Sequence, residues 1–324
     1  MEPDIDPSFY SLLSVEVPER SWVRIPSARL VGRNGLVVLP DGSFVGELVA
    51  LTPAGRQVML NQEAAYMGPL APPARRLTGQ YCLLMVIGWQ NYYHWNHDVI
   101  MRMQAYLGSL ESELRFIVPG DLKPFHLDSL KLLGIEEQRL VRFDGDSVWE
   151  IENLYIASPI YKTQIDMPEP LQWFRQRCQS QFDIRPGAAR RRIYLGRNFQ
   201  VDSHYRPTNP KEVEACLAGY GFETCYPASL SFSQQTELFS QAEYIVGTGT
   251  GLANMVFAPP GAKILQIQEP SHTVHALWTM SEALGHQYWY FWGESVANPG
   301  GYRPDIFVPI ARLEASLDAM LADR

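Results

Sequence analysis

Residues 244–261 read YIVGTGTGLANMVFAPPG, and this stretch decides how the second half of the chain is expected to fold. Its first three residues are apolar and predict a buried strand. Gly247, Gly249 and Gly251 follow at every second position, and the apolar residues after them predict a short helix that stops before Pro-Pro-Gly. A strand, a glycine turn and a helix together direct backbone N–H groups and the positive end of a helix dipole toward an anion.

Glycines have no Cβ atom and would let a bulky phosphate come close to the main chain, so the stretch predicts a site for a diphosphate-bearing ligand. A tight connection between a strand and a helix explains the same glycines equally well. The spacing GxGxG differs from the GxGxxG of dinucleotide-binding proteins, and the Gly-Lys-Ser/Thr of a P-loop is missing. A dinucleotide-dependent oxidoreductase also needs an acidic residue about 20 positions further on, which is not evident.

The composition is typical of a globular protein. With 324 residues the chain is long enough for two domains, and 46% of its residues are hydrophobic while 19% are charged. The formal net charge of -8 argues against a nucleic-acid-binding face, which would be basic. A local basic pocket is nevertheless possible, because arginines cluster at positions 190–192 and 197.

Cysteine usage and the N-terminal sequence indicate the compartment. The four cysteines form no CxxC pair, so they predict reduced thiols and no zinc framework. The N-terminal sequence MEPDIDPSFY lacks the basic and apolar regions of a signal peptide, and the apolar run at 82–87 is too short to span a bilayer. The expected protein is soluble and cytoplasmic.

The order of apolar runs and turn residues predicts an α/β fold in two domains. Residues 20–60 alternate short apolar runs with Gly, Pro and Asp turns, which is typical of hairpins. Beyond a strand expected at 81–87, strands and helices alternate and predict parallel sheets. Pro-Gly-Ala-Ala at 186–189 is the predicted boundary between an N-terminal domain, 1–187, and a C-terminal Rossmann-like domain, 188–324. Strands are expected near 115–118, 154–157, 192–195, 221–225 and 263–268, and helices near 124–133, 170–182, from 210, from 233 and at 310–321.

The second informative stretch, GWQNYYHWNHDVIMRMQAYL, occupies residues 88–107 and follows one of the expected strands. From Tyr92 onward its apolar residues recur at helical spacing. His94 and Asp98 lie four positions apart and therefore share a helix face, with Arg102 one turn further along. At the carboxyl end of a strand these groups would lie where open α/β sheets bind ligands. A surface helix with one ion pair explains the same spacing.

Three blocks of the sequence resemble the glycosyltransferase 61 family, and they occur in the family's order between residues 91 and 270. The first is NYYHWNHDVIMRM, which is similar to the family block H-W-x-x-D-x-x-x-R. The matching residues are His94, Trp95, Asp98 and Arg102.

The second and third blocks lie in the C-terminal half. RRIYLGR at 191–197, followed by Arg206 and Asn209, is similar to the family's R-x-I-Y-x-S-R segment and to the R-x-x-N start of its next helix. LSFSQQTELFSQAEYIVGTGTGLANMVFAPPG at 230–261 resembles the longest family signature. Three blocks in the same order are much more specific than any one of them.

The resemblance implies a glycosyltransferase with a GT-B fold, in which two Rossmann-like domains face each other across a cleft. It also implies inversion at the anomeric carbon, a nucleotide-sugar donor (with a UDP-linked one favoured), a glycan or lipid-linked acceptor, no obligatory metal and no other cofactor. The family includes plant xylosyl- and arabinosyltransferases, animal O-GlcNAc transferases and bacterial capsular-polysaccharide enzymes, so surface polysaccharide synthesis is the expected context. Peripheral association with the inner face of the membrane and the oligomeric state stay open.

Two departures from the family pattern bear on activity. Thr248 stands where the family usually has a histidine, which puts a histidine-mediated donor contact in doubt. The strand after Pro-Gly reads ILQIQE at 264–269, where family members often carry a glutamate, and this difference bears on ribose or uracil recognition. A non-catalytic protein that binds a nucleotide sugar or a glycan is therefore the alternative to an enzyme.

The resemblance and the residue chemistry assign roles to individual side chains. Asp98 is the first choice for the base that takes the acceptor's hydroxyl proton, with His94 orienting it; the reverse assignment is nearly as good, and His97 is the third option. No third acidic ligand accompanies the two histidines, so no metal site is expected. Helix N-capping also explains Asn209 and is expected of Ser233. Acceptor contacts are expected from Tyr92, Tyr93, Trp95 and Arg102, and donor contacts from Arg197, Arg206, Asn209, Ser233, Thr248, Gly249, Thr250, Gly251 and Asn254.

Overall fold

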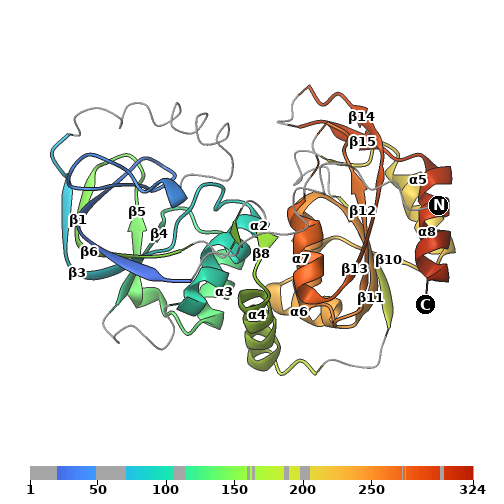
Figure 1. Cartoon of the computed structure of the whole chain (residues 1–324), viewed down its shortest axis with the longest axis horizontal. Helices are drawn as coiled ribbons and strands as arrows, with labels where there is room; N and C mark the ends of the chain where they lie inside the picture. Colours follow the sequence, from blue (N-terminus) through green and yellow to red (C-terminus); the bar gives the residue numbers. More distant parts are fainter. Residues whose placement is uncertain are drawn as a thin grey trace. The chain divides into compact units, whose positions relative to one another are not determined.

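The computed structural model describes residues 20–48, 71–105, 114–158, 161–162, 165–185, 190–197, 205–271, 273, 275–299 and 303–323. The chain has a mixed α/β fold with parallel sheets (Figure 1). Its described residues divide into two compact units, one ending at Trp173 and the other beginning at Phe174, inside helix α4 (Pro168–Gln181). The domain boundary predicted at 186–189 lies outside the described residues and stays a prediction.

The first unit, up to Trp173, is built on a six-stranded mixed sheet with the order β2-β1-β6-β3-β4-β5. β1 pairs antiparallel with β2 and β6, in keeping with the hairpins expected early in the chain. β3 runs parallel to β6 and β4, and β4 runs parallel to β5, as the alternation of strands and helices predicted. The elements are β1 (Trp22–Val31), β2 (Leu36–Val38), β3 (Arg75–Leu83), β4 (Arg115–Pro119), α3 (Pro124–Leu132), β5 (Leu140–Phe143), β6 (Trp149–Ala157) and a two-stranded ribbon of β7 (Tyr161–Lys162) and β8 (Ile165–Asp166).

A helical segment with changing pitch follows β3. α2 (Tyr92–His94) passes into the π-helix η4 (Trp95–Ile100) and then into the 3-10 helix η5 (Met101–Ala105). Asn91 caps its start, since its side-chain oxygen accepts a hydrogen bond from Tyr93 N at 2.9 Å. The sequence predicted one regular helix, and the wider π turn is the difference; such turns often occur at functional sites. Every residue of η4 is buried, so this segment is not a surface helix.

The second unit, from Phe174 onward, contains a five-stranded parallel sheet with the order β10-β9-β11-β12-β13. Helices α5 and α8 cover one face of this sheet, and α6 and α7 cover the other (Figure 1). The layered arrangement agrees with the α/β pattern predicted for the C-terminal half, although α7 and β13 were not predicted. The elements are β9 (Arg191–Leu195), α5 (Pro210–Gly219), β10 (Glu223–Cys225), α6 (Phe232–Ser240), β11 (Ala242–Thr248), β12 (Lys263–Gln268), α7 (Ala276–Leu284), β13 (Gln287–Trp292), β14 (Glu294–Val296), β15 (Asp305–Phe307) and α8 (Ile310–Ala322).

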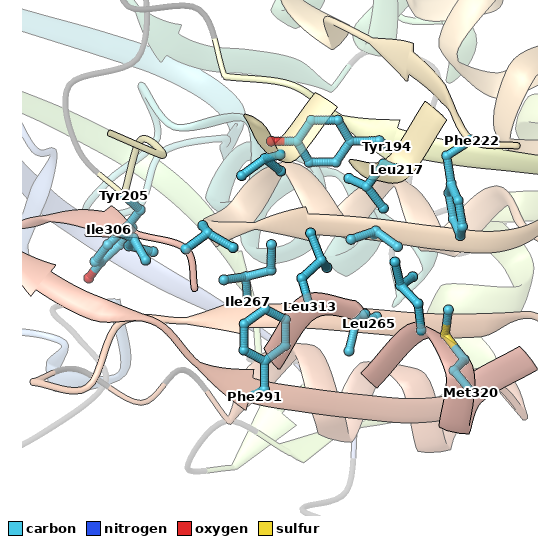
Figure 2. Close-up of a cluster of buried hydrophobic side chains, with 14 residues drawn as sticks. Tyr194, Tyr205, Leu217, Phe222, Leu265, Ile267, Phe291, Ile306, Leu313 and Met320 are labelled. Atoms are coloured by element: carbon cyan, nitrogen blue, oxygen red, sulfur yellow. The ribbon is translucent and has the colours of Figure 1, made fainter. Parts of the chain in front are cut away.

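Apolar side chains from the sheet and from α5 and α8 form a core of this unit (Figure 2). Leu265 and Ile267 of β12 meet Leu313 and Met320 of α8 in this cluster. Burying one leucine side chain contributes about 1.5–3 kcal/mol to folding. The predicted closing helix is therefore an integral part of the sheet's covering. Among the described residues, no helix is both long enough and apolar enough to cross a membrane.

One predicted helix cap is wrong, and a second is confirmed in its position but not in its side-chain bond. The N-cap of α6 is Ser231 and not Ser233: Gln234 N donates to Ser231 Oγ at 3.3 Å and Ser231 N donates to Gln234 Oε1 at 2.9 Å, which makes a capping box. Asn209 occupies the N-cap position of α5, but its side chain makes no capping bond. It instead donates to Val308 O at 3.0 Å and accepts from Val308 N at 3.1 Å. Asn209 thus fastens the segment after β15 to the start of α5.

Candidate functional site

The buried carboxylate of Asp98 is the centre of a hydrogen-bonded cluster on η4. His94 Nδ1 lies 2.7 Å from Asp98 Oδ2, and His97 Nδ1 lies 2.7 Å from Asp98 Oδ1. The first contact is the pair that the four-residue spacing predicted. The second was not predicted, because a regular helix would have directed His97 to the neighbouring face. Both carboxylate oxygens of Asp98 are therefore engaged by imidazole rings.

A fourth group, Asp166, extends the cluster. Asp166 Oδ1 is hydrogen-bonded to His97 Nε2, so that the His97 ring lies between two carboxylates. Asp166 is the last residue of β8 and lies 69 positions from His97 along the chain. It was not among the predicted site residues, because no local spacing connects it to the helical segment.

The members of this cluster differ in their exposure to solvent. The side chains of Asp98, His97 and Asp166 are 5%, 2% and 1% exposed, whereas that of His94 is 24% exposed. A cavity of about 10 Å³ borders Asp98, and such a volume holds no more than one water molecule. His94 is therefore the most solvent-exposed member of the cluster.

Burial and mutual attraction fix the charges inside the cluster. Burial lowers the pKa of His97, but the charges and hydrogen bonds of Asp166 and Asp98 outweigh it and raise that pKa to about 10. Burial acts to raise the pKa of Asp98, but the hydrogen bonds and charges of His94 and His97 outweigh it and hold that pKa well below its usual range. At neutral pH the cluster contains an ionised Asp98 and a protonated His97. No group of three or more His, Cys, Asp or Glu side chains within the described ranges is arranged to hold a metal ion.

Two neighbours orient the histidine rings. Tyr93 stacks on His97 with ring centroids 4.7 Å apart and an interplanar angle of 14°, and it meets His94 edge-on at 5.3 Å. Gly88 lies so close to the His94 ring that a Cβ atom added at residue 88 would be 2.9 Å from His94 Cδ2. Gly88 also has a φ of +83°, which glycine adopts much more readily than other residues. The position of the His94 ring therefore depends on the absence of a side chain at residue 88.

The remaining residues predicted to contact an acceptor differ in their surroundings. Trp95 is fully buried. Arg102 is also buried and donates to the backbone carbonyls of Ala157 and Ser158 at the end of β6, the latter at 3.2 Å. Tyr92 is partly exposed. Arg102 thus fastens the helical segment to the sheet, and acceptor contacts by these three residues stay predictions.

In the second unit, the predicted strand, turn and helix form β11 and the 3-10 helix η8 (Gly249–Phe257). Gly247 lies against Leu195, since a Cβ atom added at residue 247 would be 3.0 Å from Leu195 Cβ. Gly249 has a φ of +58° and lies against the ring of Tyr205. The tight connection between strand and helix therefore explains both of these glycines.

Gly251 differs from the other two glycines of the turn. A Cβ atom added there would make an ordinary contact of 3.9 Å with Arg197 Nη1, and Gly251 does not have a positive φ. Neither its conformation nor its neighbours among the described residues require a glycine. The structure thus brings the predicted guanidinium and the predicted turn together, with Arg197 Nη1 beside the bare backbone of Gly251.

Thr248 and Asn254 brace this turn. Thr248 Oγ1 donates to Tyr205 O at 2.8 Å, and Asn254 Nδ2 donates to Gly251 O at 3.2 Å. Tyr205 has a φ of +55°, a left-handed conformation that is uncommon for a tyrosine. The bond from Thr248 helps to hold that conformation. Thr250, the remaining residue of the turn, is partly exposed.

The other three predicted donor-binding residues have partners within the unit. Arg206 forms a bidentate ion pair with Asp305, whose oxygens lie 3.0 Å from Nε and 2.6 Å from Nη2. Asn209 is bonded to the backbone after β15, as described above. Ser233 Oγ lies 3.1 Å from Ser231 Oγ at the start of α6. Donor contacts by these three residues stay predictions.

The sequence profile described as Glycosyltransferase 61 matches residues 92–265, which is more than half of the chain. The match spans both the Asp98 cluster and the glycine turn. The chain belongs to the glycosyltransferase 61 family. This membership makes the protein a glycosyltransferase. The matched segment includes Asp166, whereas Gly88 lies before it. No curated protein matches the chain significantly.

We expect the free energy of unfolding of this glycosyltransferase to fall as the pH rises from about 6.5 to about 10. The pKa of His97 is raised from 6.5 to about 10 in the folded protein, so its stabilising contribution is complete below pH 6.5 and is lost as the pH approaches 10. One pKa unit corresponds to about 1.4 kcal/mol, so the loss by about pH 9 is on the order of 3 kcal/mol. Urea unfolding at several pH values measures it.

The matched control for this prediction is His97→Gln. The variant is expected to be less stable at neutral pH, with a flatter dependence of stability on pH above 6.5, because it lacks the titrating group. Asp98 affects stability in the acidic range. Its pKa is lowered in the folded protein, so its contribution to the free energy of unfolding is complete above the usual pKa of an aspartate and is lost as the pH falls below it. Equal slopes for the wild type and the variant between pH 6.5 and 9 would contradict the charge assigned to His97.

Proposed function

We propose that this protein is an inverting glycosyltransferase in which His94 is the general base that accepts the proton of the acceptor's hydroxyl group. The observation that carries this assignment is the exposure of His94 within a cluster whose other members are buried. The sequence left two assignments nearly equal, with the base on Asp98 or on His94. The geometry favours His94.

Asp98 is poorly suited to be the base. Both of its oxygens accept hydrogen bonds from histidines, and its pKa is held well below its usual range, so it has little affinity for a further proton. An ionised carboxylate can only accept hydrogen bonds, so His94 carries its proton on Nδ1 when neutral and has its lone pair on Nε2. Asp98 holds this tautomer and stabilises the imidazolium that forms when Nε2 takes a proton. His97 is already protonated and cannot serve as a base.

We further propose that Arg197 and the glycine turn hold the diphosphate of a nucleotide-sugar donor, with UDP as the favoured nucleotide. Negative charge grows on the diphosphate as it leaves the sugar, and preorganised positive groups stabilise this charge. A guanidinium offers two parallel N–H groups to phosphate oxygens. The proximity of Arg197 to Gly251 supports this role. In this proposal the protein groups do the work that a bound metal does in other transferases.

The remaining parts of the proposal depend on family membership. The acceptor is a glycan or a lipid-linked sugar, and the context is surface polysaccharide synthesis in the cytoplasm, at the inner face of the membrane. The fold is of the GT-B type, with the donor on the unit from Phe174 onward and the base on the other unit. Glycosyltransferase 61 membership supports a sugar transferase.

A second function is favoured by Thr248, which stands where the family usually has a histidine. Its hydroxyl group donates to Tyr205 O, so its proton is used inside the protein. A family member that binds a nucleotide sugar without turnover would tolerate this change. Such a protein would bind the donor but neither hydrolyse nor transfer it.

A thermal-shift screen over nucleotide sugars, repeated with Gly251→Ala, tests the donor site. A ligand at 100 times its dissociation constant stabilises the wild type by about 2.7 kcal/mol. We expect Gly251→Ala to have the same melting temperature without ligand, because the closest described atom to the added methyl group makes an ordinary contact of 3.9 Å. With the nucleotide sugar we expect its affinity to fall by about tenfold or more, since the methyl group occupies the space proposed for a phosphate.

The control for this variant is Gly219→Ala at the end of α5, where a Cβ atom would have no atom of the described residues within 4 Å. It should bind the nucleotide sugar as the wild type does. Wild-type affinity in Gly251→Ala would remove the turn from the donor site. Stabilisation by NAD but by no UDP-sugar would instead favour a dinucleotide-dependent oxidoreductase.

A further inference from the structure

His97 occupies an unusual place in the Asp98 cluster, because it is enclosed and both of its ring nitrogens face carboxylate oxygens. Nδ1 contacts Asp98 Oδ1 and Nε2 contacts Asp166 Oδ1. An ionised carboxylate has no proton to donate, so each of these contacts is a hydrogen bond only if the imidazole nitrogen carries the proton. A neutral imidazole would direct one bare nitrogen at a carboxylate oxygen.

The surroundings of His97 agree with a permanent positive charge. Within the described part of the chain, the charged and titratable groups of this cluster are Asp98 and His94 from its own segment and Asp166 from β8. Tyr93 offers the face of its ring at 4.7 Å, an arrangement that attracts a cation. The basic Arg102 bonds to the backbone oxygen of Asp98 at 3.3 Å and not to its carboxylate.

We propose that Asp166 is a positioning residue of the transfer reaction: it keeps His97 protonated, and the resulting cation orients Asp98 and moderates how strongly Asp98 attracts a proton to His94. The inference rests on the proposed role of His94 as the base. Asp166 contacts the Nε2 side of the His97 ring, and Asp98 contacts the Nδ1 side, so Asp166 acts on His94 through His97 and Asp98. Carboxylates and imidazoles thus alternate along one series of contacts, from the buried Asp166 through His97 and Asp98 to the exposed His94 ring.

The consequence concerns the charge that His94 faces. In the wild type, Asp98 carries one negative charge and the adjacent His97 carries one positive charge, which partly cancels the field of Asp98. Asp166 supplies the second negative charge that the buried imidazolium needs, but it lies on the far side of His97. Removing the charge of Asp166 would release the second proton of His97 and leave Asp98 without an adjacent cation.

The test is Asp166→Asn, which keeps the shape of the side chain and removes its charge. The introduced amide can donate to Nε2 of a neutral His97, while Nδ1 still donates to Asp98, so the hydrogen bonds of the cluster persist. Because Asp98 then attracts a proton to His94 more strongly, we expect the acid limb of the pH profile of kcat/KM to move upward by about one pH unit. The plateau rate and KM for the donor should change little. The control is Asp128→Asn, the same substitution at an exposed position of α3, which should leave the profile in place.

A merely structural role for Asp166 would lower the rate at every pH and leave the acid limb where it is, and that result would overturn the proposal. Nitrogen-15 NMR of the histidine rings gives a second measurement that needs no substrate. In the wild type we expect both nitrogens of His97 to stay protonated from about pH 5 to pH 8.5. In Asp166→Asn we expect His97 to titrate within this range.

These two measurements separate the inference from the proposed function. If the protein transfers no sugar, the proposed function fails, and the NMR titration of His97 in the wild type and in Asp166→Asn still decides whether Asp166 keeps His97 protonated. If transfer is observed while one nitrogen of wild-type His97 is bare at pH 7, the function stands and the role of Asp166 is wrong.

Discussion

Replacing His94 with glutamine is expected to lower kcat for sugar transfer by about 10²–10⁴-fold, the usual contribution of a positioned general base. Glutamine retains a hydrogen-bonding group of similar reach that can donate to Asp98, but it cannot take up a proton near neutral pH. His94 is the most exposed member of the Asp98 cluster, so the substitution should have little effect on the free energy of unfolding. Initial rates at saturating donor and acceptor measure the effect.

The binding of the donor is the internal control for His94→Gln. The stabilisation by a nucleotide sugar should equal that of the wild type, because the donor site is proposed for the unit from Phe174 onward. The remaining activity of the variant should also lose the acid limb of its pH profile. If the variant keeps more than a tenth of the wild-type kcat, a group other than His94 is the general base.

The second large effect is expected for Arg197→Ala. Removing one preorganised hydrogen-bond donor that faces charge developing in the transition state typically raises the activation barrier by about 2.7–4 kcal/mol, which lowers kcat by about 10²–10³-fold. Arg197→Lys should restore only part of this loss, since an ammonium group cannot make the parallel pair of hydrogen bonds that a guanidinium makes to a phosphate. Single-turnover rates with a bound nucleotide sugar separate this effect from a change in affinity.

Arg190→Ala is the matched control for this substitution. Arg190 directly precedes β9 and Arg197 lies just beyond the carboxyl end of the same strand. The guanidinium of Arg190 is 76% exposed and pairs with Glu243 at 2.8 Å, an interaction worth at most about 1 kcal/mol. Arg190→Ala should keep its activity. An equal loss of activity in both variants would indicate a general effect of charge and not a phosphate contact at Arg197.

Local spacing predicted those parts of the molecule that depend on neighbouring residues. The strand and glycine turn around Gly247 followed from one stretch of sequence, as did the contact between His94 and Asp98. The capping box of Ser231 and Gln234 was also readable, since it has the pattern of a serine followed three positions later by a glutamine. The prediction of Ser233 as the N-cap overlooked this pattern.

Contacts between distant segments could not be predicted in this way. Asp166 reaches His97 across 69 positions, on a ribbon whose strands are only two residues long. The π turn of η4 changes the direction of His97, and no residue pattern distinguishes it from an ordinary helix. β13 has the sequence QYWYFW, in which aromatic residues occupy both faces and hide the alternation typical of a strand.

The close contact between Gly88 and the His94 ring has a consequence for how activity can be lost in this protein. A single methyl group at residue 88 would act as a wedge against the imidazole edge, and it would also strain a backbone that turns with a positive φ. The position of the His94 ring, the proposed base, is thus set by an atom that is absent from residue 88. Sequence variants that silence the enzyme need not alter any ionisable group, and residue 88 is the first position at which to look for them.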